Sequence, residues 1–239
     1  MSAGLALWFS AWATGAVSLD DARDAIVGED TSHDVAGLPG EDGVVPLVLA
    51  LGLLRSARTT GAGIALPIPG DPLGLAGPSD FNTRALEAGE GVVFDGADIG
   101  LVPRRAGPGV VWSYYQATSH RQVPDPAEAD TTLRNAVLTA ADTLADLDVA
   151  RWRPEVADEL MALRRAADFH FPHGMAPRAL KLVSLSTRCR TIVDLALEDE
   201  DEGAAISAFE ADRRRAALSP LDHAARRGFV AACSFPWER

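Results

Sequence analysis

The chain has 239 residues and a mass of 25.2 kDa, which suits one large domain or two small ones. Hydrophobic residues make up 47% of the sequence, which excludes a chain that is disordered throughout, because such a chain cannot bury enough apolar surface. The net charge of −12 repels phosphate backbones, so we expect no nucleic-acid partner. No motif in the sequence identifies a chemistry, and we predict no cofactor.

The sequence also argues against a membrane protein. Its longest uninterrupted apolar run is Val44–Leu54, and a helix needs ~20 apolar residues to span a bilayer. The apolar segment Met1–Val17 lacks the basic residues that begin a secretory signal, since the first basic residue is Arg23. Cys189 and Cys233 lie in apolar helical patterns, which favours buried, reduced thiols. We therefore expect a soluble, cytoplasmic protein.

Three helices are predicted at the start of the chain. Large apolar residues recur there at helical spacing, namely Leu5, Trp8, Phe9 and Trp12. The sequence Ser18-Leu-Asp-Asp21 is a variant of the capping box that begins many helices. Residues 28–43 are rich in Gly and acidic residues and are predicted to form a loop. The predicted helices cover residues 2–14, 18–27 and 44–57.

The pattern then changes to strands. Asp95-Gly96 lies between two apolar segments, which predicts a tight hairpin. The segment from Arg104 to Gly109 is predicted to be a turn before the most apolar strand. The predicted strands lie near residues 63–68, 91–94, 97–102 and 109–116. Together they predict a small, mainly antiparallel sheet of about four strands.

The second half of the chain is predicted to be a helical bundle of about five helices. One helix carries the apolar stripe Leu182, Leu185, Cys189 and Ile192. Another begins at Pro154, and Ser219-Pro-Leu-Asp222 is predicted to start the last one after a helix over 204–217. The fold class is therefore α+β, with an α+β half over 1–122 and a helical half over 123–239. Whether the halves form two domains or one continuous domain stays open.

Two neighbouring features supply candidate site residues. A stiff loop over 69–80 carries Asp71, Ser79 and Asp80, and long ordered loops are often functional. The end of the most apolar strand, 114–121, carries the rest, and strand ends commonly hold site residues on a rigid support. The catalytic candidates are His120, Asp71 and Asp80. The ligand-binding candidates are Arg121, Tyr114, Tyr115 and Ser79. The ordinary interpretation is a packed surface loop with solvated side chains.

One further cluster could bind a metal ion. Asp168, His170 and His173 place three oxygen or nitrogen ligands within six residues. Their spacing matches no established metal motif, and His near a helix end also stabilises the terminal carbonyls. We therefore expect no bound metal.

Two classes of function remain. The first is a binding or interaction protein, expected to form a homodimer through its aromatic N-terminal helix. The second is a small-molecule hydrolase or transferase, with a pocket built from loop 69–80 and strand end 114–121. The absence of a catalytic signature favours the first, and a small-molecule ligand stays possible.

Overall fold

The computed structural model describes residues 1–146, 170–198 and 208–234. Contacts between residues divide the chain into two compact units. Unit 1 contains Met1–Val123, His170–Ala179 and Cys233–Arg239, and unit 2 contains Pro124–Phe169 and Leu180–Ala232. The α+β class is confirmed: helices and a mixed sheet come first, and helices follow.

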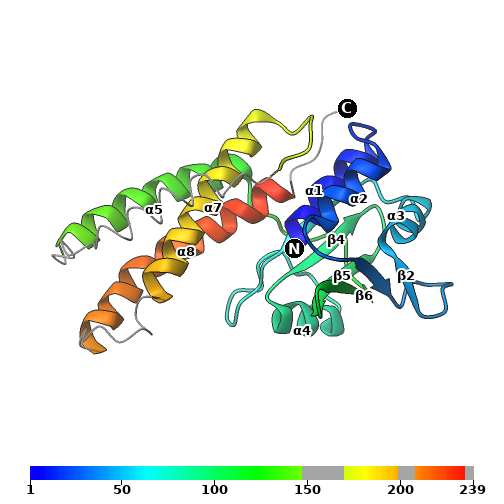
Figure 1. The fold of residues 1–239 in the computed structure, drawn as a ribbon. Helices are drawn as coiled ribbons and strands as arrows, with labels where there is room; N and C mark the ends of the chain where they lie inside the picture. Colours follow the sequence, from blue (N-terminus) through cyan, green and yellow to red (C-terminus); the bar gives the residue numbers. More distant parts are fainter. Residues whose placement is uncertain (147–169, 199–207, 235–239) are drawn as a thin grey trace. The chain divides into compact units, whose positions relative to one another are not determined.

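Unit 1 is built around a six-stranded sheet with the order β2-β1-β6-β5-β4-β3 (Figure 1). Strand β1 runs parallel to β6, and every other pair is antiparallel. The strands are β1 (His33–Ala36), β2 (Val44–Pro46), β3 (Gly61–Ala65), β4 (Gly91–Asp95), β5 (Ile99–Ala106) and β6 (Gly109–Gln116).

The prediction of about four strands was too low, because β1 and β2 were missed. Strand β1 lies within the segment predicted as a loop, and β2 occupies the first residues of a predicted helix. Both are very short, and Gly and acidic residues surround them, so neither shows an alternating pattern over enough positions to indicate a strand. The pairing of β1 with β6, and of β2 with β1, is what makes them strands.

The boundaries of three other elements differ from the predicted ones. Helix α3 (Leu47–Ser56) begins after Pro46 and not at residue 44. Strand β3 ends at Ala65, short of the predicted residue 68. Strand β5 continues through the predicted turn to Ala106, because Gly107 and Pro108 suffice to reverse the chain into β6.

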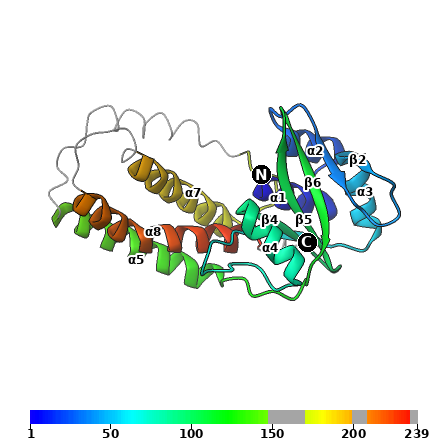
Figure 2. The same ribbon diagram turned by 90° about the horizontal axis from the view of Figure 1, so that it is seen from below.

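Helices cover both faces of the sheet (Figures 1 and 2). Helix α1 (Ser2–Ala13) packs on β3 and β4, where the Phe9 ring meets the Phe94 ring edge-on at 4.9 Å. Helix α4 (Ser79–Ala88) lies against the other face, where Phe81 packs with Val93. Val93 and Phe94 are neighbours in β4, and neighbours in a strand point to opposite faces. Helix α2 (Leu19–Val27) packs on α1, and it begins with the predicted contacts between Ser18 and Asp21.

The aromatic side chains of α1 are all buried inside unit 1. Trp8 stacks on the ring of His170, with centroids 6.3 Å apart, and Trp12 lies beneath the guanidinium of Arg55. These residues were the reason to expect a dimer through α1. Their burial removes that reason, because the apolar area is already covered by the chain's own core.

The described part of unit 2 consists of three packed helices, α5 (Pro126–Asp146), α7 (Pro177–Glu198) and α8 (Ala208–Cys233). A break was predicted before Pro220, but α8 runs through it. Leu218 and Leu221 are buried on either side, and this packing offsets the backbone hydrogen bond that proline removes. The helix predicted at Pro154 lies outside the described residues.

Helices α7 and α8 approach closely at Gly228. A methyl group added there would lie 2.6 Å from Ser186 Oγ. The buried face of α7 differs from the predicted stripe, because Leu182 and Cys189 are buried whereas Leu185 and Ile192 are only half-buried. In the described part of the chain, none of the helices combines the length and apolar character needed to cross a bilayer.

The two leucines of α7 should therefore differ in their effect on stability. Leu182→Ala should lower the free energy of unfolding by about 2–5 kcal/mol, because it empties a fully buried site. Leu185→Ala should cost clearly less, since its side chain keeps contact with solvent. Urea unfolding of the two variants measures the difference. Equal losses would contradict this assignment of the buried face.

Candidate functional site

Side chains satisfy the outer edge of β3, where no further strand is paired. Ser10 of α1 accepts a hydrogen bond from the Ala62 amide at 2.9 Å and lies 3.3 Å from its carbonyl oxygen. Two residues further along, the Ile64 amide donates to Ser234 Oγ at 3.1 Å. Arg121 completes the edge: its Nη1 donates to the Ile64 carbonyl at 2.9 Å, and its Nη2 to Ser234 Oγ at 3.3 Å.

The guanidinium of Arg121 is unusually placed for a charged group. Burial lowers its pKa, and the charge of Asp95 only partly opposes this. Burial likewise raises the pKa of Asp95, against the opposing effect of Arg121. No carboxylate of the described residues lies within ion-pair distance of Arg121, and its buried Nε–H has no acceptor.

Two glycines make room for this arrangement. A methyl group on Gly63 would lie 1.9 Å from Arg121 Nη2 and 2.5 Å from Ser234 Oγ. On Gly74, in the candidate loop, it would lie 2.7 Å from the Ile64 carbonyl oxygen. Only the bare backbone of glycine therefore allows the loop and the guanidinium to approach β3 together.

The structure brings the candidate loop and the candidate strand end together. The Thr118 amide donates to the Gly77 carbonyl at 2.9 Å. Leu75 of the loop and Tyr115 of β6 pack on the same buried cluster beside Phe81. The two segments predicted to build one pocket are therefore in contact with each other.

The acid–base candidates do not form one constellation in the described contacts. His120 is exposed and its Nδ1 lies 3.5 Å from Ser119 Oγ, with no carboxylate bonded to it among the described residues. Asp71 closes a tight turn with Ile68. Ser79 and Asp80 are exposed in the first turn of α4, and Tyr114 is half-buried in β6.

The metal candidates are likewise separated. Asp168 lies outside the described residues. The His170 ring stacks on Trp8, and its carbonyl accepts the indole N–H at 3.2 Å. His173 is exposed. Within the described ranges, no three His, Cys, Asp or Glu side chains are grouped as metal ligands would be.

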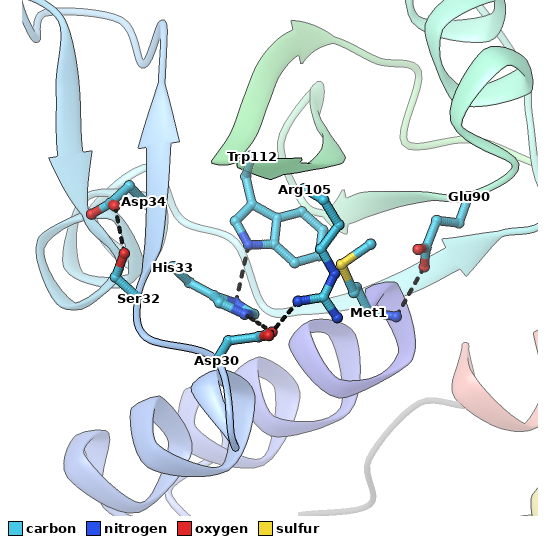
Figure 3. Close-up of polar contacts among 8 residues, drawn as sticks. All are labelled: Met1, Asp30, Ser32, His33, Asp34, Glu90, Arg105 and Trp112. Carbon is cyan, nitrogen blue, oxygen red and sulfur yellow. Dashed lines mark hydrogen bonds and ion pairs between the residues drawn. The ribbon is translucent and has the colours of Figure 1, made fainter. Parts of the chain in front are cut away.

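The structure also contains a buried polar cluster that no sequence pattern predicted. His33 of β1 is buried between Asp30 and Trp112 (Figure 3). Its Nε2 lies 2.9 Å from Asp30 Oδ2, and the Trp112 indole N–H donates to its Nδ1 at 3.3 Å. Arg105 of β5 also donates to Asp30. Asp30 and His33 lie in a predicted loop, Arg105 in a predicted turn and Trp112 in a predicted strand, so no pattern indicated that they would meet.

The donors in this cluster define a single protonation pattern. An indole nitrogen can only donate, so Nδ1 of His33 must accept and the ring proton lies on Nε2, facing Asp30. Both ring nitrogens are then used, which leaves no free base. The cluster ties β1 to β5 and β6. The hydrogen bond from His33, and then that from Arg105, lowers the pKa of Asp30.

The opposite edge of the sheet is apolar. Val44 of β2 is 58% exposed, and Val48 and Leu49 of α3 are 39% and 47% exposed. We call these three residues the β2 patch. Leu138 of α5 is a further exposed apolar side chain, and it lies in the other compact unit. Beyond the strand pairing with β1, the described contacts show no hydrogen bond to Val44.

Comparison with known proteins identifies two domain families in sequence. Residues 2–129 match the Rv1486c-like protein N-terminal domain, and residues 127–230 match the corresponding C-terminal domain. The chain is 28% identical to the uncharacterized protein Rv1486c of Mycobacterium tuberculosis, over 80% of this chain and 81% of the relative. It is 31% identical to the uncharacterized protein MAV321 of Mycobacterium avium, over 66% of this chain and 65% of the relative. No solved structure matches the chain.

The close approach at Gly63 generates a stability test. Gly63→Ala should lower the free energy of unfolding by about 1–3 kcal/mol, because the new methyl group overlaps Arg121 and Ser234. The matched control is Gly52→Ala in α3, where a methyl group meets nothing within 4 Å. That change should stabilise the helix by up to about 1 kcal/mol. Similar effects of the two substitutions in chemical denaturation would contradict the packing at Gly63.

The lowered pKa of Asp30 generates a pH dependence. Its ionised form is favoured in the folded state, so its contribution is complete above the ordinary value of 3.8 and is lost as pH falls below it. Asp30→Asn should therefore destabilise the protein at neutral pH, and its difference from the wild type should shrink in acid. Urea unfolding at several pH values measures this. The exposed Asp42→Asn serves as control, and a difference for Asp30→Asn that is independent of pH would refute the assignment.

Proposed function

We propose that this chain, which belongs to the Rv1486c-like protein family and contains both of the family's domains, is a binding protein. It acts by pairing with a second copy of itself. The observation that carries this proposal is the β2 patch at the open edge of the sheet. Surface apolar residues are ordinary when scattered, whereas a group of them beside an unpaired strand is typical of an interface.

The direction of the backbone groups of β2 supports pairing at this edge. The Gly37 amide donates to the Gly43 carbonyl, so Gly43 faces β1. Groups alternate along an antiparallel strand, and the N–H and C=O of Val44 therefore face outward. Pro46 has no N–H, which limits how far a ladder can extend.

A second copy of this chain suits the short edge of β2 better than a longer strand of another protein would. Two β2 strands related by a two-fold axis at Val44 can exchange two backbone hydrogen bonds, and one surface then serves both partners. The same axis brings the two Val44 side chains opposite each other and Val48 and Leu49 of both copies near them. Burial of these apolar side chains then adds the free energy of association that two hydrogen bonds alone do not provide.

The proposed setting is the cytoplasm. Cys189 is buried and forms no disulfide, which supports a reducing environment. The alternative, a small-molecule hydrolase or transferase, is supported by the contact between loop 69–80 and strand end 114–121. It would also require an acid–base pair, and the described contacts of His120 include no carboxylate.

The proposal is tested by sedimentation velocity at micromolar concentration. The wild type should sediment at about twice 25.2 kDa. Val44→Lys combined with Leu49→Lys should give a folded monomer, because both side chains are exposed in the single chain and both would place charge in the interface. Circular dichroism checks the fold of the variant.

The control is Leu138→Lys, which changes an even more exposed apolar residue (65%) on α5 and should leave the dimer intact. A wild type that sediments as a monomer would refute the proposal. A dimer that survives the double substitution would place the interface elsewhere and would also refute it.

A further inference from the structure

The Arg121 guanidinium has more hydrogen-bonding capacity than its structural role uses. Arginine carries five N–H groups. Two of its nitrogens are engaged, one with the Ile64 carbonyl and one with Ser234 Oγ. Its Nε–H is buried without an acceptor. A buried donor with no acceptor calls for an explanation, and a bound ion or small ligand is one.

Capping the strand edge does not require a positive charge. At Ala62, two residues away on the same edge, the hydroxyl of Ser10 contacts both backbone groups and carries no charge. At Ile64 the backbone carbonyl is instead bound by the Arg121 cation. This cation loses hydration and gains no ion pair in the described structure. Even partial burial of a charge without an ion pair is costly, and this cost is the reason to infer a charged ligand at this position.

The surroundings define what this cation can bind. One side of the guanidinium is held in place by β3 and Ser234. Gly63 has no side chain, and any side chain there would overlap the guanidinium. A fixed guanidinium fork matches the two oxygens of a carboxylate. Asp95 acts on Arg121 through its charge, and the whole chain carries −12, so a doubly charged phosphate is disfavoured.

We propose that Arg121 binds the carboxylate group of a small monoanionic ligand at the outer edge of β3, beside Ser234 and the loop that contains Gly74. The Nη–H groups that the Ile64 carbonyl and Ser234 leave unused donate to the carboxylate oxygens. The site lies on the opposite edge of the sheet from the β2 patch, so it is independent of the proposed dimer.

The test uses sodium acetate as the probe, with sodium chloride at the same ionic strength as the reference. Acetate should raise the melting temperature of the wild type to a saturating value, with half of the effect at roughly millimolar concentration for so small a ligand. Arg121→Gln should abolish this rise. Arg104→Gln, an exposed arginine of β5, should leave it unchanged.

A second measurement covers the case in which Arg121→Gln does not fold. The Nε–H resonance of Arg121 in the wild type, assigned by NMR, should shift with acetate along a saturation curve. Acetate that produces neither a saturable rise in melting temperature nor this shift would overturn the proposal. A saturable response to inorganic phosphate with none to acetate would overturn the ligand class.

Discussion

Unit 1 depends on the need to satisfy the backbone of β3 at an edge where no strand follows. Every N–H and C=O in this buried strand must find a partner, because an unpaired buried group costs about as much as a lost hydrogen bond. Ser10 supplies one partner from the mostly apolar helix α1. Ser234 and Arg121 supply the others from segments 170 and 57 residues away in sequence. The edge therefore joins the start, the middle and the end of the described chain.

The two edges of the sheet are treated in opposite ways. At β3, side chains block the backbone groups, which protects the edge against pairing. At β2, Pro46 and a length of three residues limit pairing, yet Val44 keeps outward-facing groups next to exposed apolar side chains. Between the edges, His33 secures the single parallel pair by bonding to Trp112 and Asp30. This contrast is the basis for separating an association surface from a ligand site.

Part of the candidate site could be foreseen from the sequence. Loop 69–80 and strand end 114–121 are in contact, and Arg121 lies at a structurally special position. The role of Arg121 could not be foreseen, because its partners are a backbone carbonyl of β3 and a serine far along the chain. His33 was missed for a similar reason: one partner, Asp30, lies in the same predicted loop, and the other, Trp112, comes from a strand far along the chain.

The sequence by itself determined the features that rest on local interactions. Helical spacing placed α1, and the contacts of Ser18 and Asp21 began α2. Asp95-Gly96 placed the reversal between β4 and β5, although the pairing closes at Phe94 and Ile99, so β5 begins at Ile99 and not at residue 97. Only the tertiary structure decided that residues 33–36 form a strand, that α8 continues through Pro220, and that the aromatic residues of α1 face the core. Each of these depends on burial against residues distant in sequence, and packing energy of that kind overrides weak local preferences.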